Sequence, residues 1–199
     1  MKHLLNAQFM QRISSTGELR QNKHGTVVYC VGFLIIISLW ILVFARELSA
    51  LSFIRYTLLI TLGYIAMIYD ISTKRIPNAL VLTMMAFWIL LIMPMIIFGK
   101  DNKVGLLMDS IFGLLTGGGL FLLVYLISKK GLGGGDVKFM AAAGLYLGVA
   151  ETVPSILYGT VLAAITGLVL IITKKIGRKD TIPLAPFLFA GIMITLVTK

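Results

Sequence analysis

Seven apolar runs, separated by short polar segments, account for nearly all of the chain after His24. A transmembrane helix needs roughly 20 mostly apolar residues, and most of the runs come near this length. They cover residues 26–45, 52–69, 79–98, 104–127, 137–150, 153–173 and 183–198. We therefore expect an all-α polytopic membrane protein, a bundle of about seven transmembrane helices that leaves no room for a separate soluble domain.

The composition agrees with this fold class. Of the 199 residues, 58% are hydrophobic and 13% are charged, whereas a soluble domain has about 25% charged residues. The net charge of +10 could indicate a nucleic-acid partner, but the eighteen Lys and Arg residues lie in short clusters between apolar runs rather than along one face. We expect contact with membrane lipids and no nucleic-acid partner, and the sequence does not indicate an oligomeric state.

The basic residues also indicate an orientation. If the N-terminus is cytoplasmic, thirteen of the eighteen Lys and Arg residues lie on the inner side and five on the outer side, as the positive-inside rule favours. We expect a multi-pass protein of the cell membrane whose N-terminus is cytoplasmic and whose C-terminus is outside. Residues 1–25 then form a cytoplasmic tail, and residues 26–199 form the transmembrane domain.

The fifth run, residues 137–150, is short for a full crossing. It is rich in small residues that allow close helix approach, so it can lie inside the bundle. These residues are Ala141, Ala142, Ala143, Gly144 and Gly148. The alternative is a re-entrant segment, which would leave six crossings.

Two aspartates from distant parts of the chain fall at the inner membrane boundary. Asp70 lies in MIYDISTKRIPN at the end of the second run, and Asp136 follows three glycines in KKGLGGGDVKFMAAAG. Ionisable residues that face the interior of a membrane bundle are usually functional, whereas aspartates in hydrated loops cost little, and position alone leaves both interpretations open. Two carboxyl groups held close together share a proton, so that one can act as general base toward water and the other as acid toward a carbonyl. That chemistry is peptide hydrolysis without a metal.

Six residues near these aspartates could shape a site or bind substrate. The glycines can adopt backbone angles closed to other residues and leave no side chain in the way of a peptide, although they could also form a simple turn. The prolines could free backbone groups for pairing with an extended substrate, or simply begin a helix. The lysine could hold a phosphate or anchor the chain at the interface. The six residues are Gly133, Gly134, Gly135, Lys138, Pro183 and Pro186.

Other ionisable residues give weaker signals. Asp109 lies in the fourth run near the outer face, across the membrane from the pair, which favours a packing or helix-start role. Asp180 is on the inner side, next to Arg178 and Lys179, and has no glycine run before it. This pattern is typical of a solvated charge in a loop. The two histidines and the single cysteine have no partner at metal-ligand spacing, so we expect no metal site and no cofactor.

Three motifs, in this order, resemble those of the type IV prepilin peptidases, which are intramembrane aspartic proteases of the GxGD type. They are DISTKRIPN from Asp70, GLGGGDVKFMAAAG around Asp136 and IPLAPFLFAG from Ile182. The resemblance covers about residues 52–198 and implies that Asp70 and Asp136 are the catalytic pair. Larger members carry a cytoplasmic domain with paired cysteines linked to N-methylation. Because Cys30 is the only cysteine in these 199 residues, the resemblance implies the compact form, with proteolysis alone.

The resemblance implies an aspartic endopeptidase that cleaves the leader of type IV prepilin-like proteins at the cytoplasmic face, with residues 26–199 as the peptidase domain. Its substrate would carry a basic leader followed by an apolar helix. Another GxGD intramembrane protease is an alternative, although RIPN after Asp70 favours the prepilin branch. A small ion- or proton-coupled transporter that uses Asp70 and Asp136 is a second alternative, but its polar groups would be expected near the midplane, often with repeat symmetry. A third alternative is a catalytically inactive assembly subunit, but such a protein would have no need of the two aspartates.

Overall fold

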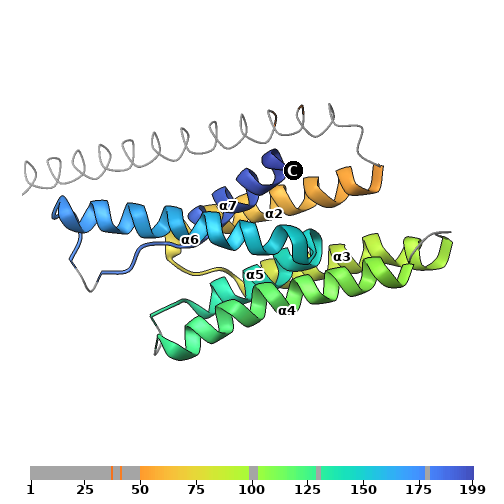
Figure 1. Ribbon diagram of the computed structural model, residues 1–199, viewed down its shortest axis with the longest axis horizontal. Coiled ribbons are helices and arrows are strands. Elements are labelled where there is room, and N and C mark those ends of the chain that lie inside the picture. The colour runs from red at the N-terminus through yellow and green to blue at the C-terminus, as the bar shows by residue number, and fades with distance from the viewer. Residues whose placement is uncertain (1–36, 38–40, 42–49, 99–102, 129–130, 178–179) are drawn as a thin grey trace, which may run out of the picture. The chain divides into compact units, whose positions relative to one another are not determined.

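The computed structural model describes residues 37, 41, 50–98, 103–128, 131–177 and 180–199. Within these ranges the chain forms six helices of more than one turn and no strand (Figure 1). They are α2 (Ala50–Thr73), α3 (Asn78–Phe98), α4 (Lys103–Ile127), α5 (Gly134–Leu147), α6 (Val149–Ile172) and α7 (Ala185–Thr198). The predicted all-α class is confirmed. The predicted tail, residues 1–25, lies outside the described residues, and so does the first predicted helix, residues 26–45, except at positions 37 and 41.

The described helices suit a membrane environment. Three of them contain segments long and apolar enough to cross a membrane, namely Ser52–Thr73, Val104–Ile127 and Val149–Ile172. Large apolar side chains on α4 and α6 are exposed, as expected for helices that face lipid rather than water. Examples are Leu115, Leu123, Leu126, Leu157, Ile165, Leu168 and Ile172. The chain is an all-helical membrane protein, while the number of its crossings and their orientation stay predictions.

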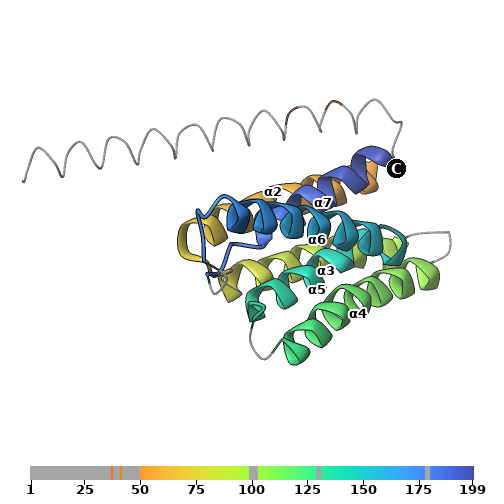
Figure 2. The ribbon, with the colours of Figure 1, turned by 60° about the vertical axis from the view of Figure 1, so that its left-hand side comes forward.

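Helix α5 lies at the centre of the helix packing. It contacts α2, α3, α4 and α6, and Figure 2 shows it flanked by α3 and α4. Tyr146 of α5 is fully buried, and its hydroxyl donates to the carbonyl oxygen of Met84 in α3, so the polar end of this aromatic side chain is satisfied. The prediction that the short fifth segment lies inside the bundle is therefore confirmed. Its buried apolar residues include Phe139, Met140, Ala142, Ala143, Leu145 and Leu147.

Glycines bring α4 and α5 into close contact. A Cβ atom at Gly113 would overlap the carbonyl oxygen of Gly144, and a Cβ atom at Gly144 would overlap that of Gly113. One turn further along α4, a Cβ atom at Gly117 would overlap the carbonyl oxygen of Met140. The small residues of α5 therefore have the predicted role of allowing close helix approach.

Four helix starts differ by two or more residues from the predicted ones, and the first is that of α2, which begins at Ala50 rather than at residue 52. Helix α5 begins at Gly134 rather than at residue 137, α6 begins at Val149 rather than at residue 153, and α7 begins at Ala185 rather than at residue 183. Asp136 consequently lies in the first turn of α5, where the helix dipole favours a negative charge. Only Gly148 separates α5 from α6, and its φ of 76° belongs to a backbone region that other residues rarely adopt.

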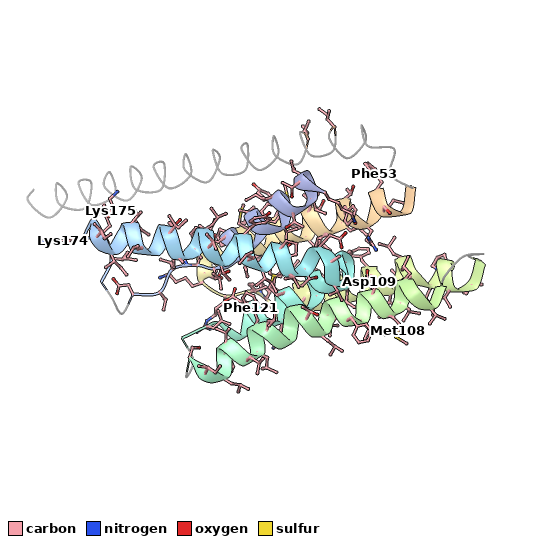
Figure 3. The ribbon with its side chains drawn as sticks, in the orientation of Figure 1. Phe53, Met108, Asp109, Phe121, Lys174 and Lys175 are labelled. Atoms are coloured by element: carbon pink, nitrogen blue, oxygen red, sulfur yellow. The ribbon has the colours of Figure 1, made fainter. Side chains whose placement is uncertain are left out.

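Asp109, in the second turn of α4, caps the start of α6 (Figure 3). Its Oδ1 accepts a hydrogen bond from the backbone N–H of Val149 at 3.0 Å. Its carboxylate also lies against Gly148, where an added Cβ atom would overlap it. The predicted helix-start role of Asp109 is confirmed, but the helix it starts is α6 rather than its own.

Candidate active site

Asp70 lies in the last turn of α2 and is 5% exposed. Its Oδ2 accepts a hydrogen bond from the backbone N–H of Ala185, the first residue of α7, at 2.9 Å. The N-terminus of a helix has backbone N–H groups without partners in the helix and favours a negative charge. Asp70 therefore joins the end of α2 to the start of α7.

Asp136 is 8% exposed, and its Oδ1 is buried without a hydrogen-bond partner among the described residues. The pKa of Asp136 is raised from 3.8 to about 7, mainly by burial and also by the charge of Asp70, while a backbone hydrogen bond at Gly133 acts in the opposite direction. The rise has a simple cause, since a carboxylate removed from water without donors is costly. Asp136 is thus suited to carrying a proton near neutral pH.

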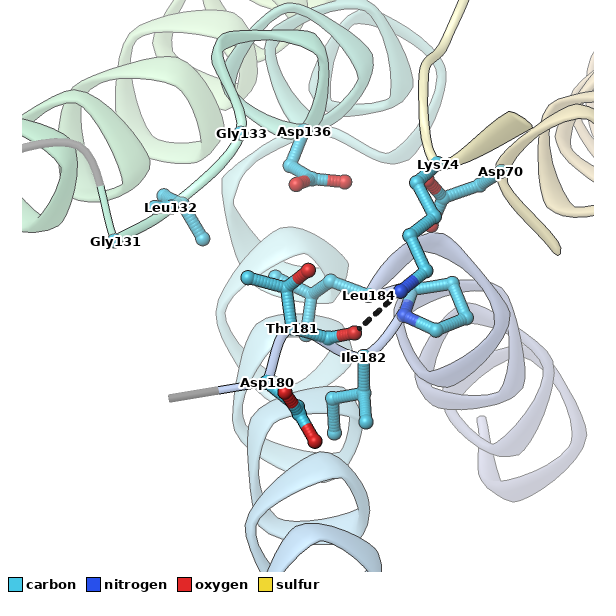
Figure 4. Close-up of a pocket in the computed structure, with 11 residues that line it drawn as sticks. Asp70, Lys74, Gly131, Leu132, Gly133, Asp136, Asp180, Thr181, Ile182 and Leu184 are labelled. Atoms are coloured by element: carbon cyan, nitrogen blue, oxygen red, sulfur yellow. Dashed lines mark hydrogen bonds between the residues drawn. The ribbon is translucent and has the colours of Figure 1, made fainter. Parts of the chain in front are cut away.

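The two aspartates line the same pocket. Its larger part has a volume of about 440 Å³ and is bounded by residues 131–133, residues 180–184, Asp70, Lys74 and Asp136. A smaller part of about 210 Å³ is bounded by the same two aspartates and Lys74, by the glycines 133–135, and by residues 75, 76 and 78. In Figure 4 the carboxyl group of Asp136 points toward the side of the pocket on which Asp70 lies. The aspartates therefore lie where the two parts meet.

The three glycines before Asp136 contribute space rather than unusual backbone angles. Gly133 has φ −72° and ψ 133°, which any residue can adopt, and Gly148 is the only glycine with positive φ in the described ranges. The predicted need for angles closed to other residues is therefore wrong at Gly133, Gly134 and Gly135. A Cβ atom at Gly133 would come within 2.8 Å of Asp136 Oδ2, and one at Gly135 would press on Ile76. Gly134 has open space around it and lines the smaller part.

The other predicted site residues divide between the pocket and its surroundings. Pro183 lines the larger part, whereas Pro186 lies in the first turn of α7 and lines neither part. Proline is well tolerated in a first helical turn, so the helix-start role fits Pro186 better than Pro183. Lys138 lines neither part, and its Nζ donates to Asn78 Oδ1 at 2.9 Å, which links α5 to the start of α3. Asp180 is exposed, as predicted, but it also lines the larger part.

Sequence analysis missed Lys74 and, apart from Pro183, the segment 180–184 as parts of the site. Lys74 lines both parts of the pocket, and its Nζ donates to the carbonyl oxygen of Thr181 at 2.8 Å. A signal was available, because Lys74 follows Asp70 by only four residues at the end of the same predicted helix. The partner, a backbone carbonyl far along the chain, has no sequence signature. No group of three or more His, Cys, Asp or Glu residues within the described ranges is arranged to hold a metal ion.

The fold and the site together define an all-helical membrane protein with two buried aspartates at one end of its helices. Residues 56–171 match the model of the type IV leader peptidase family, and the chain belongs to this family. The resemblance drawn from the three motifs is therefore confirmed at the level of the family.

Several curated relatives carry the name prepilin leader peptidase/N-methyltransferase. The chain is 31% identical over 190 residues to the one from Escherichia coli (strain K12), a match that covers 89% of this chain and 77% of the relative. It is 26% identical over 132 residues to the one from Bacillus subtilis (strain 168), covering 66% of this chain and 50% of the relative. The chain thus spans about half the length of the Bacillus protein. No solved structure matches the chain significantly.

Proposed function

We propose that this chain is a membrane-embedded aspartic endopeptidase that removes the leader of type IV prepilin-like proteins, with Asp70 and Asp136 as its catalytic pair. One observation carries the proposal: two buried aspartates from different motifs line one pocket, and Oδ1 of Asp136 has no partner among the described residues. A carboxyl group in this state is costly to the fold, and such groups concentrate at functional sites. Membership of the leader peptidase family supports the substrate class.

In the proposed mechanism Asp70 starts as the ionised partner and Asp136 as the protonated one. The N–H of Ala185 donates to Asp70, whereas the pKa of Asp136 is raised to about 7. Asp70 takes a proton from a water molecule as the water attacks the scissile carbonyl carbon, and Asp136 donates its proton to the carbonyl oxygen. The tetrahedral intermediate then collapses as Asp70 passes the proton it took from water to the leaving amine, and Asp136 takes back a proton from a hydroxyl of the intermediate, so that both aspartates return to their starting states.

The substrate would cross the pocket as an extended peptide. Its scissile bond lies between the aspartates, and the peptide on either side occupies the larger and the smaller part. The absence of a side chain at Gly133 leaves room next to Asp136. The backbone around Pro183 forms the facing wall and offers groups for pairing with the peptide. A basic leader followed by an apolar helix would suit a site at the end of membrane helices.

The pocket end is proposed to face the cytoplasm. Basic residues gather at this end of the described helices, and the positive-inside rule assigns such an end to the inner side. On this assignment the N-terminus is cytoplasmic, the C-terminus is outside, and residues 26–199 form the peptidase domain of a multi-pass cell-membrane protein. The basic residues are Lys74, Arg75, Lys138, Lys174 and Lys175.

A precursor-processing assay tests the proposal. Asp70→Asn and Asp136→Asn should each abolish cleavage of a co-expressed precursor with a basic leader and an apolar segment, because an amide can neither accept the proton of water, as Asp70 does, nor donate a proton to the carbonyl oxygen, as Asp136 does. The double variant should be little worse than either single one, since the pair acts as a unit. The measurement is a gel shift of the precursor beside the amount of enzyme in the membrane.

Asp109→Asn is the matched control, because the carboxylate of Asp109 also accepts a backbone N–H from another helix but lies outside the pocket. It should keep cleavage in proportion to the protein present, since asparagine also caps helices. Normal processing by either Asp70→Asn or Asp136→Asn would rule out the mechanism.

A further inference from the structure

We propose that Lys74 is a positioning residue that holds the segment 180–184 in place as one wall of the pocket. Its Nζ donates to the carbonyl oxygen of Thr181 at 2.8 Å, which Figure 4 shows as the dashed line across the pocket. Lys74 lines both parts of the pocket, so its side chain lies at the point where they meet. The predicted effect of Lys74 on substrate binding rests on the proposed peptidase function. Its predicted effect on the position of the wall does not.

The last turn of α2 and the residue that follows the helix hold the segment at two points. Asp70 accepts the N–H of Ala185, just after the segment, and Lys74 donates to Thr181, near its start. The residues between the two points, 182–184, all line the larger part of the pocket. Movement of the wall therefore requires the loss of one of these two hydrogen bonds.

The backbone of Lys74 determines which substitution tests its side chain. Its N–H donates to the carbonyl oxygen of Asp70 at 2.8 Å, and its φ is 52°, in the left-handed region. Glycine adopts this conformation without strain, whereas a lysine is disfavoured there. A glycine at this position therefore removes the side chain without straining the backbone.

Lys174 provides the comparison that the chain itself offers. It follows α6 with a φ of 55°, so it has the same backbone conformation at the end of another helix (Figure 3). Its side chain is exposed and makes no hydrogen bond within the described ranges, and it lines neither part of the pocket. A glycine at either position relaxes the backbone and removes one positive charge from the same end, but only at Lys74 does it release the wall.

The first experiment measures the wall without reference to catalysis. In a Cys30→Ser, Ile182→Cys background, the rate of maleimide labelling of the cysteine at position 182 reports how often the segment opens. The side chain of Ile182 lies against Gly167 of α6, so opening uncovers it. Lys74→Gly should raise the labelling rate about three- to tenfold, as expected for the loss of a hydrogen bond from an exposed charged donor. Lys74→Arg keeps donors and charge and should label at close to the parent rate.

Lys174→Gly is measured in the same background and should also label at the parent rate. Equal labelling of the Lys74→Gly and Lys174→Gly proteins would overturn the proposal. Because the labelling needs no substrate, it tests the role of Lys74 even if no pilin-like precursor is cleaved, and that second result would count against the proposed function alone.

The second experiment follows cleavage in the chain without the labelling substitutions. Lys74→Gly should lower kcat/KM for the precursor about three- to tenfold, mainly through a higher KM, because the wall contacts the substrate and the reacting atoms keep their partners. Thermal stability should be unchanged or higher, since glycine relieves the left-handed position. Lys74→Arg should restore most of the activity. A loss of activity that follows a loss of folded protein, with no rescue by arginine, would contradict a positioning role.

Discussion

Replacing Asp136 by asparagine should alter stability in a way that depends on pH. The pKa of Asp136 is raised from 3.8 to about 7, mainly because burial disfavours its charge. The folded protein then holds this proton more tightly than the unfolded chain does, so the contribution to stability is full below about pH 3.8 and is lost as pH rises to about 7. An asparagine does not ionise, and the variant should lack this part of the pH dependence.

The size of the effect follows from two opposing terms. A pKa difference of this size corresponds to about 4 kcal/mol of destabilisation above pH 7, at about 1.4 kcal/mol for each pKa unit. The asparagine leaves a buried polar group where Oδ1 has no partner, which costs about 1–3 kcal/mol at every pH. The variant should therefore be less stable than the parent near about pH 4 and more stable by about 1–3 kcal/mol at about pH 8.

The assay is thermal unfolding in a mild detergent across this pH range, followed by tryptophan fluorescence, since Trp88 is buried in α3. A gain of 1 kcal/mol should appear as roughly 2–4 °C in Tm for a chain of this size. In the Asp70→Asn protein, the loss of stability caused by ionisation of Asp136 should occur at a lower pH than in the parent, because the charge of Asp70 is one cause of the raised pKa of Asp136. Parallel pH curves for the parent and the Asp136→Asn protein would refute the buried, protonated state on which the assigned acid role depends.

Three further predictions concern the rest of the fold. Asp109→Ala should destabilise the protein by about 1–2 kcal/mol in the same melting assay, because Val149 loses its cap, while the cleavage of each folded molecule is unchanged. Gly144→Leu should prevent accumulation of folded protein in the membrane, because its side chain would overlap the backbone at Gly113. A reporter fused after Lys199 should be active only outside the cytoplasm, and a cytoplasmic signal would contradict the predicted orientation.

The sequence predicted the helices well and their ends poorly. Apolar runs identify membrane helices because lipid requires about 20 apolar residues in a row, and five of the six described helices follow these runs closely. The start of α6 was missed because its cap, Asp109, comes from α4 rather than from the residues before Val149. Local signals cannot reveal a cap supplied by another helix.

The aspartates could be chosen from the sequence because carboxyl groups are rare in apolar surroundings. Their surroundings could not be predicted in the same way. The wall opposite Asp136 is held by Lys74 through the backbone carbonyl of Thr181 and by Asp70 through the backbone N–H of Ala185. Every residue except proline has both backbone groups, so side-chain identity at Thr181 or Ala185 carries no information about these contacts.

The packing of α4 against α5 explains how a helix of 14 residues holds Asp136 at a fixed position along the helix bundle. At about 1.5 Å per residue such a helix is about 21 Å long, shorter than the hydrocarbon core of roughly 30 Å, so its own length does not fix its position along the membrane normal. The position of α5 is fixed instead by its contacts with α4, which repeat every four residues on one face of each helix. The contacting pairs are Asp109 with Gly148, Gly113 with Gly144, and Gly117 with Met140.

This register has a consequence for the chemistry. The same four-residue spacing, continued antiparallel on the two helices, predicts that Phe121 of α4 lies one step beyond the Gly117–Met140 contact. Phe121 is 4% exposed, so α4 stays buried at this step. The glycine contacts thus fix the height of α5 against α4, and with it the height of Asp136 in the first turn of α5, while Asp70 is held separately by its bond to the start of α7.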